Sequence, residues 1–183
     1  MDMRERIKEV AVEHFDRHGY HGTSIRNIAK DVNCSLPMIY YYFNNKKELF
    51  DEIIKNEFFD LLKRQAALLK AGDIIEFYTK FVYGLNALSD YDKRVYRLGI
   101  KVYLCFDGDE ELREVMDQWE RTILPRHHEI LKPHLMDADD GIALTRTLVH
   151  LLENLIQSIV VKNRFLPEDE IREALSIVLH GCI

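Results

Sequence analysis

Apolar residues recur every three or four positions along most of this 183-residue chain. This spacing places them on one face of a helix with about 3.6 residues per turn, whereas a half-buried strand alternates with a period of about two. The pattern therefore predicts an all-α protein of about nine helices and no strand. The predicted helices cover residues 4–18, 25–32, 36–43, 47–69, 73–88, 91–105, 110–131, 140–162 and 167–182.

Two short apolar stripes near the amino terminus, over 25–32 and 36–43, stand only three residues apart. Two helices so close in sequence must pack across a tight turn, which is a helix-turn-helix. Asn33 suits the turn because asparagine, after glycine, best tolerates a left-handed backbone. Ser35 can cap the second helix, and Pro37 fits its first turn, where a missing N–H costs little.

The stretch from Thr23 to Leu49 contains a characteristic set of residues: Thr23, Arg26, Ile28, Ala29, Asn33, Ser35, Pro37, Ile39, Tyr40, Tyr42, Phe43, Lys46 and Leu49. With these residues it resembles the amino-terminal DNA-binding domain of TetR-type (TetR/AcrR) transcriptional regulators. These proteins share a threonine-capped helix, a G-V-S-like turn and the pattern [LI]-Y-x-[HY]-F-x-[SN]-K-x-x-L. Asn33 departs from the family's turn glycine. The resemblance implies a DNA-binding domain at 1–47 and an effector-binding and dimerisation domain at 48–183.

The resemblance also implies which residues contact DNA, because the second helix of such a motif enters the major groove and flanking groups hold phosphates. Arg26 is the best candidate for a bidentate contact to guanine, and the alternative is an arginine that is simply exposed on the first helix of the motif. Tyr40 is expected to continue the buried stripe while its hydroxyl reaches a phosphate. An exposed Leu-Pro-Met suits thymine methyl groups, which favours A·T-containing half-sites. The predicted DNA-binding residues are Thr23, Arg26, Ser35, Leu36, Pro37, Met38, Tyr40, Tyr41, Tyr42, Lys46 and Lys47.

Aromatic residues are frequent in the predicted helices between 73 and 131. Most such residues form the core of a bundle. In TetR-type regulators the corresponding bundle encloses an effector pocket, for which an apolar or aromatic small molecule is the expected ligand. Ligand binding would favour a conformation in which the distance between the DNA-binding domains of the two copies no longer matches the spacing of the operator half-sites. The candidate pocket residues are Phe77, Tyr78, Phe81, Tyr96, Arg97, Tyr103 and Trp119.

The last two predicted helices are apolar on more than one face. Such helices must be buried on more than one face, and a chain of this size lacks the interior to cover both. We therefore expect an outward stripe to meet a second copy; in TetR-type proteins the corresponding helices form a four-helix interface. The candidate dimer contacts are Leu148, Leu152, Leu155, Ile159, Ile171, Leu175, Val178 and Leu179.

The composition, with 47% apolar and 31% charged residues, is typical of a soluble globular protein. No segment approaches the ~20 uninterrupted apolar residues of a membrane span. The charged amino terminus lacks the apolar region of a signal peptide, so we expect a cytoplasmic protein with reduced cysteines. Residues 1–47 hold eight Lys/Arg and six Asp/Glu, a net charge of +2. Because the whole chain has a net charge of −6, the remaining residues carry −8. This asymmetry alone does not indicate nucleic acid.

Two alternatives to a ligand-responsive repressor that binds a palindromic operator remain open. A metal enzyme is conceivable because His14 and His18 are four residues apart and three more histidines follow at 127, 128 and 134. No third ligand, Gly-rich phosphate loop or C-x-x-C pair accompanies them, so we expect neither catalysis nor a cofactor. The second alternative is a TetR-like activator, co-regulator or DNA-organising protein without a small-molecule ligand, since fold does not fix function.

Overall fold

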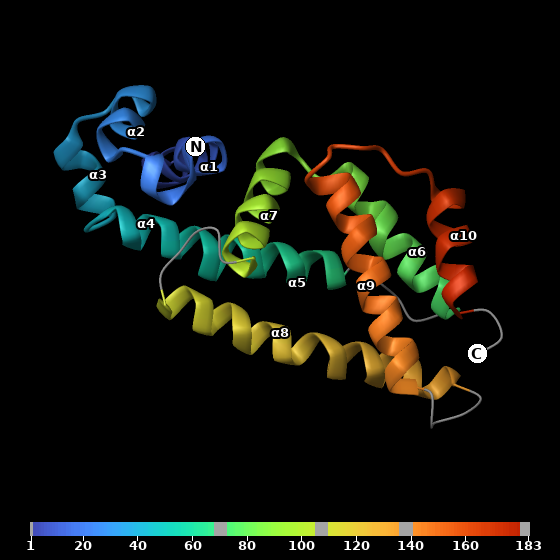
Figure 1. Cartoon of the computed structure of the whole chain (residues 1–183). Coiled ribbons are helices and arrows are strands. Elements are labelled where there is room, and N and C mark those ends of the chain that lie inside the picture. Colours follow the sequence, from blue (N-terminus) through green and yellow to red (C-terminus); the bar gives the residue numbers. More distant parts are fainter. Residues whose placement is uncertain (1, 68–72, 105–109, 136–140, 180–183) are drawn as a thin grey trace. The chain divides into compact units, whose positions relative to one another are not determined.

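The computed structural model describes residues 2–67, 73–104, 110–135 and 141–179, and every regular element within them is helical (Figure 1). Three short segments supplement the α-helices: a π segment η1 (Ile53–Phe58) and the 3₁₀ turns η2 (Leu85–Ala87) and η3 (Lys132–His134). The α-helices are α1 (Met3–Gly22), α2 (Ile25–Val32), α3 (Leu36–Tyr42), α4 (Lys46–Glu52), α5 (Phe59–Ala67), α6 (Ile74–Gly84), α7 (Asp90–Tyr103), α8 (Glu110–Leu131), α9 (Gly141–Val160) and α10 (Glu168–Leu179).

The predicted all-α class is confirmed. Helices α4, η1 and α5 follow one another without a break and form one rod, so the described ranges contain nine continuous helices, as the periodicity predicts. Pro125 lies inside α8, which continues to Leu131 as expected. The predicted helix ends at 69, 105, 140 and 182, and the cysteines at 105 and 182, lie outside the described residues. Cys34 is a free thiol.

The helix-turn-helix forms for the local reasons visible in the sequence. Asn33 adopts the left-handed conformation, with φ 60° and ψ 47°, and its N–H donates to the carbonyls of Ala29 and Lys30. The Ser35 hydroxyl accepts the N–H of Met38 at 3.3 Å and so caps α3. Both expectations for the turn are confirmed. Gly19 interrupts the end of α1 with φ 69°, a conformation that favours glycine.

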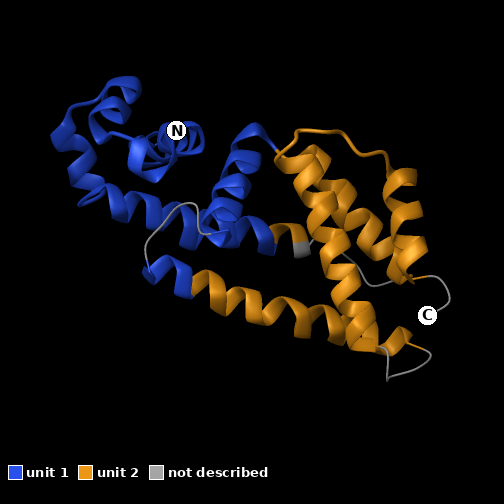
Figure 2. Cartoon of the chain, viewed as in Figure 1, with its two compact units in different colours: residues 1–63, 89–114 blue, residues 64–88, 115–183 orange. Residues whose placement is uncertain are grey.

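The chain divides into two compact units, which Figure 2 shows in different colours. Unit 1 comprises residues 1–63 and 89–114, and unit 2 comprises 64–88 and 115–183. These compact units are not the domains expected from the sequence, whose boundary between residues 47 and 48 stays a prediction. Unit 1 takes in α7 because that helix packs against both α1 and η1, a contact between distant parts of the sequence that helical periodicity does not reveal.

An ion cluster fastens α7 to α1 within unit 1. The Arg97 guanidinium donates to both carboxylate oxygens of Asp16, with its Nε 3.1 Å from each. Lys101 Nζ lies 3.4 Å from the same carboxylate. Burial acts to raise the pKa of Asp16, but the two cations outweigh it and hold that pKa below its usual value. Arg97, predicted to face an effector pocket, therefore belongs to a structural ion pair.

The π segment packs tightly against α7. Phe58 is buried, and its ring meets that of Tyr96 edge-on at 5.5 Å between centroids. A Cβ atom on Gly99 would lie only 2.5 Å from the Phe58 ring. The two helices can approach this closely because Gly99 has no side chain. Tyr96, another predicted pocket residue, is accordingly part of the core of unit 1.

In unit 2, α10 packs against α6 and α9, and this packing corrects the predicted dimer contacts. Seven of the eight predicted residues are buried inside the chain itself, and only Val178 is half-buried. The apolar pattern identifies two helices with a broad apolar surface, but it does not tell which side faces their own unit. The buried seven are Leu148, Leu152, Leu155, Ile159, Ile171, Leu175 and Leu179.

Candidate nucleic-acid interface

Helix α3 is anchored by a single row of side chains and exposes the rest. Ile39 and the following Phe43 are buried, at 0% and 1% exposure. Tyr40 is 46% exposed, which corrects the expectation that it continues the buried stripe. In a helix of seven residues the row at positions 39 and 43 is enough to hold the helix in place, so the neighbouring position can face solvent.

The exposed side of α3 is apolar and aromatic. Met38 is 41% and Tyr41 80% exposed, and Ser35 and Pro37 are also exposed, whereas Leu36 is half-buried. The Tyr41 ring meets the half-buried Tyr42 ring edge-on at 5.1 Å. An exposed surface of this kind is unusual for a solvated helix, and it is chemically suited to thymine methyl groups and sugar edges.

Arg26 stands on the exposed side of α2. The buried side of that helix consists of Ile25, Ile28, Ala29 and Val32. Within the described ranges, the Arg26 side chain makes no hydrogen bond or ion pair. Its guanidinium donors are therefore available for a bidentate contact.

Lys46, one of the predicted DNA-binding residues, makes contacts inside the protein. Its ammonium group donates to the backbone carbonyls of Tyr20 at 2.8 Å and Thr23 at 3.1 Å. It also lies 4.4 Å from the centroid of the Tyr20 ring, within cation–π range. These contacts join the start of α4 to the end of α1 and to Thr23, which follows it. We therefore assign the Lys46 side chain to positioning the helices rather than to a phosphate.

Thr23 is also committed to internal contacts. It is 4% exposed, and its hydroxyl donates to the Gly19 carbonyl at 2.8 Å. Ser24, not Thr23, occupies the N-cap position of α2. The expected threonine cap of α2 is therefore wrong, because the Thr23 hydroxyl instead bonds to the end of α1.

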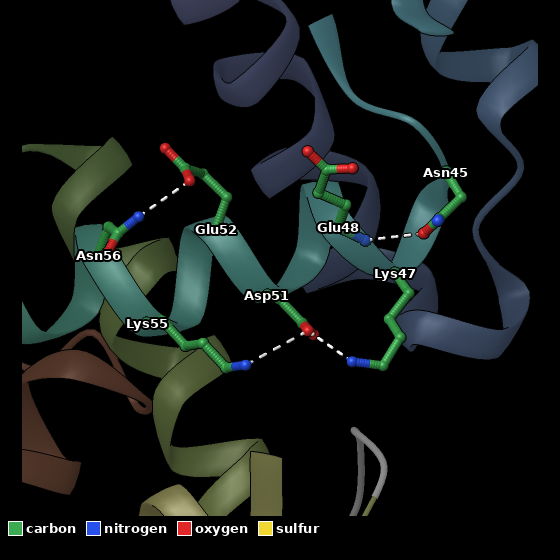
Figure 3. Close-up of a pocket in the computed structure, with 7 residues that line it drawn as sticks. All are labelled: Asn45, Lys47, Glu48, Asp51, Glu52, Lys55 and Asn56. Carbon is green, nitrogen blue, oxygen red and sulfur yellow. Dashed lines mark hydrogen bonds and ion pairs between the residues drawn. The ribbon is translucent and has the colours of Figure 1, made fainter. Parts of the chain in front are cut away.

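Lys47 lies in a polar pocket along α4 and η1, and Figure 3 shows it and Lys55 reaching toward Asp51 from either side. Lys47 donates to Asp51 at 2.6 Å and to Glu111 at 3.0 Å. The i, i+4 spacing of Lys47, Asp51 and Lys55 is a visible sign of helix ion pairs, but the distant partner Glu111 has no local signal. The pocket is lined by Asn45, Lys47, Glu48, Asp51, Glu52, Lys55 and Asn56.

The predicted effector residues are divided between the two units. Tyr96, Arg97 and Tyr103 belong to unit 1, whereas Phe77, Tyr78, Phe81 and Trp119 belong to unit 2. The buried Tyr78 hydroxyl lies 2.8 Å from His127 Nδ1. Burial lowers the pKa of His127 to about 4 and raises that of Tyr78, so both groups are neutral at neutral pH. Phe77, Phe81 and Trp119 are half-buried and remain candidates.

Three of the five histidines singled out in the sequence, at positions 14, 127 and 128, each have a separate hydrogen-bond partner. His14 Nε2 lies 2.8 Å from an Asp31 carboxylate oxygen, and His128 Nδ1 lies 3.2 Å from the Thr145 hydroxyl. Among the residues with described positions, no three His, Cys, Asp or Glu side chains form a group that could hold a metal ion.

Known proteins resemble this chain in sequence. Residues 7–53 match the family model of bacterial regulatory proteins, tetR family. An uncharacterized HTH-type transcriptional regulator, YhgD of Bacillus subtilis, is 32% identical over 130 residues, which span 68% of this chain and 64% of the relative. The biofilm operon icaADBC HTH-type negative transcriptional regulator IcaR of Staphylococcus epidermidis is 25% identical over 135 residues, or 71% of this chain and 68% of that one.

Solved structures share the whole fold. A TetR-like transcriptional regulator from Rhodococcus sp. RHA1 aligns over 98% of this chain and 94% of its own, with a TM-score of 0.77 at 18% identity. The chain belongs to the TetR family of transcriptional regulators. A transcriptional regulator from Aquifex aeolicus VF5, also similar, has a TM-score of 0.70 and 25% identity over 97% of this chain and 98% of that one. TetR-family proteins are DNA-binding regulators and not enzymes, so membership of this family argues against the metal-enzyme alternative.

No helix among the described residues of this TetR-family chain is long and apolar enough to cross a membrane.

The Lys46 contacts predict an unusual response to mutation. Lys46→Met should weaken binding to all DNA sequences because the α1–α2 connection loses its tie to α4. The slope of the logarithm of the binding constant against the logarithm of the salt concentration should stay unchanged. Loss of a phosphate contact would instead make that slope shallower by about 0.9. Fluorescence anisotropy with labelled duplexes at several salt concentrations measures both quantities. A shallower slope would show that Lys46 does contact phosphate.

Proposed function

We propose that this protein is a negative regulator that binds a palindromic operator as a homodimer, acts in the cytoplasm and is released by a small apolar or aromatic effector. The main support is the exposed α3 surface beside an unpaired Arg26 on a TetR-type scaffold. Repression, rather than activation, is supported by the similarity to IcaR, which is named as a negative regulator.

Arg26 reads guanine in this proposal, while Met38 and Tyr41 contact thymine methyl groups or sugars. Tyr40 and Tyr42 direct hydroxyls toward phosphates, with Ser35, Leu36 and Pro37 completing the contact surface. These residues are on α2 and α3, and a unit this small reads few base pairs. Two copies with half-sites about 34–36 Å apart would supply the missing specificity.

The dimer contact is proposed on the apolar residues that α9 and α10 leave uncovered. Ile177 is 75% exposed, Val161 48% and Ile142 46%. Val149 and Ile156 follow Ile142 at seven-residue intervals on α9 and are half-buried. A row of apolar side chains at seven-residue intervals along a helix is typical of a helix–helix contact.

Ile177→Glu is expected to weaken dimerisation roughly tenfold or more, because it places a charge where an apolar side chain would be buried. Light scattering across a dilution series measures the change. Gln118→Glu on the exposed side of α8 introduces the same charge and should leave the mass unchanged. A dimer equally stable in both variants would contradict the proposed contact.

The proposed effector site is in unit 2, near the half-buried Phe77, Phe81 and Trp119. Aromatic side chains of this kind provide apolar contact area for a small ligand. Trp119 is the only tryptophan in the chain, so quenching of its fluorescence reports a ligand bound close to it. A compound that quenches Trp119 and releases DNA over the same concentration range would support the effector role.

Footprinting on the DNA upstream of the gene is the direct test of this function. We expect two protected half-sites related by two-fold symmetry, and a reporter whose transcription falls when the protein is present. Binding that shows no preference over unrelated DNA would overturn the proposal. A rise in transcription would assign the protein to the activator alternative.

A further inference from the structure

Four charged side chains form one cluster at the start of the α4–η1–α5 rod, here called the Glu111 cluster: Lys47, Asp51, Lys55 and Glu111. Lys47 Nζ lies 2.6 Å from Asp51 Oδ2 and 3.0 Å from Glu111 Oε2. Lys55 Nζ lies 2.5 Å from Glu111 Oε1 and 3.6 Å from Asp51 Oδ2. Each lysine thus bridges the same two carboxylates. All four residues belong to unit 1.

The charges of the Glu111 cluster cancel. Two ammonium groups face two carboxylates, so the cluster has no net charge. The hydrogen bonds from Lys55 and Lys47 lower the pKa of the Glu111 carboxyl below its usual value, which keeps Glu111 ionised at neutral pH. Replacing Glu111 by a neutral residue would therefore leave one uncompensated positive charge in the cluster.

The position of Lys47 makes that charge relevant to DNA. Lys47 is the second residue of α4, and only three residues, 43–45, separate α4 from the reading helix α3. Lysines that flank a recognition helix contact phosphates. At Lys47, however, two carboxylates already occupy the ammonium group. Its contribution to DNA binding depends on whether a phosphate can displace one of them.

Glu111 is the carboxylate that can be displaced. Its side chain is 60% exposed, whereas that of Asp51 is 14% exposed and lies one turn from Lys47 on the same rod. Exposed ion pairs are individually weak and exchange readily with solvent ions. Glu111 also comes from α8, a single helix that continues from unit 1 to Trp119 and Leu131 in unit 2.

We infer that Glu111 competes with DNA phosphate for Lys47 and thereby limits the affinity of this regulator for DNA. The inference rests on the proposed function, because it requires the face beside α3 to meet DNA. Glu111 is a negative determinant of affinity for all sequences, since a phosphate contact carries no base information. The first turn of α8 thus sets how much positive charge the DNA-binding unit presents.

The test compares Glu111→Gln with Glu110→Gln. Glu110 is exposed and next in sequence, and within the described ranges it makes no ion pair. Both variants therefore lose one negative charge, but only Glu111→Gln removes a carboxylate that contacts Lys47. Glu111→Gln should bind operator and unrelated duplex about fivefold more tightly at 0.1 M salt. The slope of the logarithm of its binding constant against the logarithm of the salt concentration should be steeper by about 0.9. Glu110→Gln should leave the slope unchanged.

A third variant locates the effect on Lys47. In Lys47→Met/Glu111→Gln the gain in affinity and slope should disappear. Equal slopes for Glu111→Gln and Glu110→Gln, or a gain that survives removal of Lys47, would overturn the inference. The measurement on unrelated duplex separates this outcome from failure of the proposed function, which would appear as loss of operator preference in the wild-type protein.

Discussion

Replacing Arg26 by alanine is expected to reduce the preference of this protein for its operator over unrelated DNA by about tenfold to a hundredfold, since a bidentate arginine–guanine contact contributes about 1–3 kcal/mol of discrimination. The expectation follows from the exposure of Arg26 on α2 and the lack of an ion-pair partner for it among the described residues. Anisotropy titrations with operator and scrambled duplexes give the ratio directly.

Lys30→Ala is the matched control for Arg26→Ala. Lys30 is also an exposed cation of α2, four residues further along, and it has no ion-pair partner in the part of the chain that the structure describes. Its loss should weaken both duplexes by the same factor, because lysine near a groove contributes mainly non-specific affinity. Identical effects of the two substitutions on the affinity ratio would show that Arg26 reads no base.

Gly99→Ala is expected to destabilise the protein, although helix propensity alone predicts the opposite sign. Alanine in a helix interior is favoured over glycine by about 1 kcal/mol. At Gly99 the new methyl group would lie 2.5 Å from the Phe58 ring, which is fully buried and held edge-on by Tyr96. Overpacking of this kind costs about 1–3 kcal/mol beyond the propensity gain. Thermal or urea unfolding monitored by circular dichroism measures the change.

Two further variants separate the contact from a general effect of replacing glycine. Gly84→Ala should be neutral or stabilising, because the nearest atom to its new Cβ is Gln65 Oε1 at 3.7 Å. Phe58→Leu should be less damaging in the Gly99→Ala background than alone, because the smaller side chain makes room for the methyl group. Additive effects of the two substitutions would mean that the ring and the glycine are not in contact.

The helix-turn-helix could be predicted from the sequence because the interactions that form it are local. The left-handed turn at Asn33 and the cap at Ser35 involve atoms no more than four residues away. The spacing of Ile39 and Phe43 likewise identifies the row that anchors α3. The prediction that the neighbouring Tyr40 is buried is wrong, because a seven-residue helix has too few turns to define the width of its buried face.

Contacts between distant residues could not be predicted in this way. A lysine after a reading helix has the same sequence context whether it meets a phosphate or, as Lys46 does, two carbonyls more than twenty residues away. The apolar faces of α9 and α10 pose the same problem. Leu175 and Val178 both belong to the predicted apolar stripe, but only the packing of α6, α9 and α10 shows that the first is buried and the second half-buried.

The π segment η1 makes chain length, as well as side-chain chemistry, a determinant of this architecture. A π turn takes in one residue more than an α turn, so η1 shifts the helical phase of α4 by about 100° relative to an uninterrupted helix. Removing one residue between Ile53 and Phe58 would restore α-helical hydrogen bonding while rotating Lys47 and Asp51 away from Glu111. A single-residue deletion there that spares Lys55 would therefore change which face of the rod carries the charges, although all four side chains of the Glu111 cluster are retained.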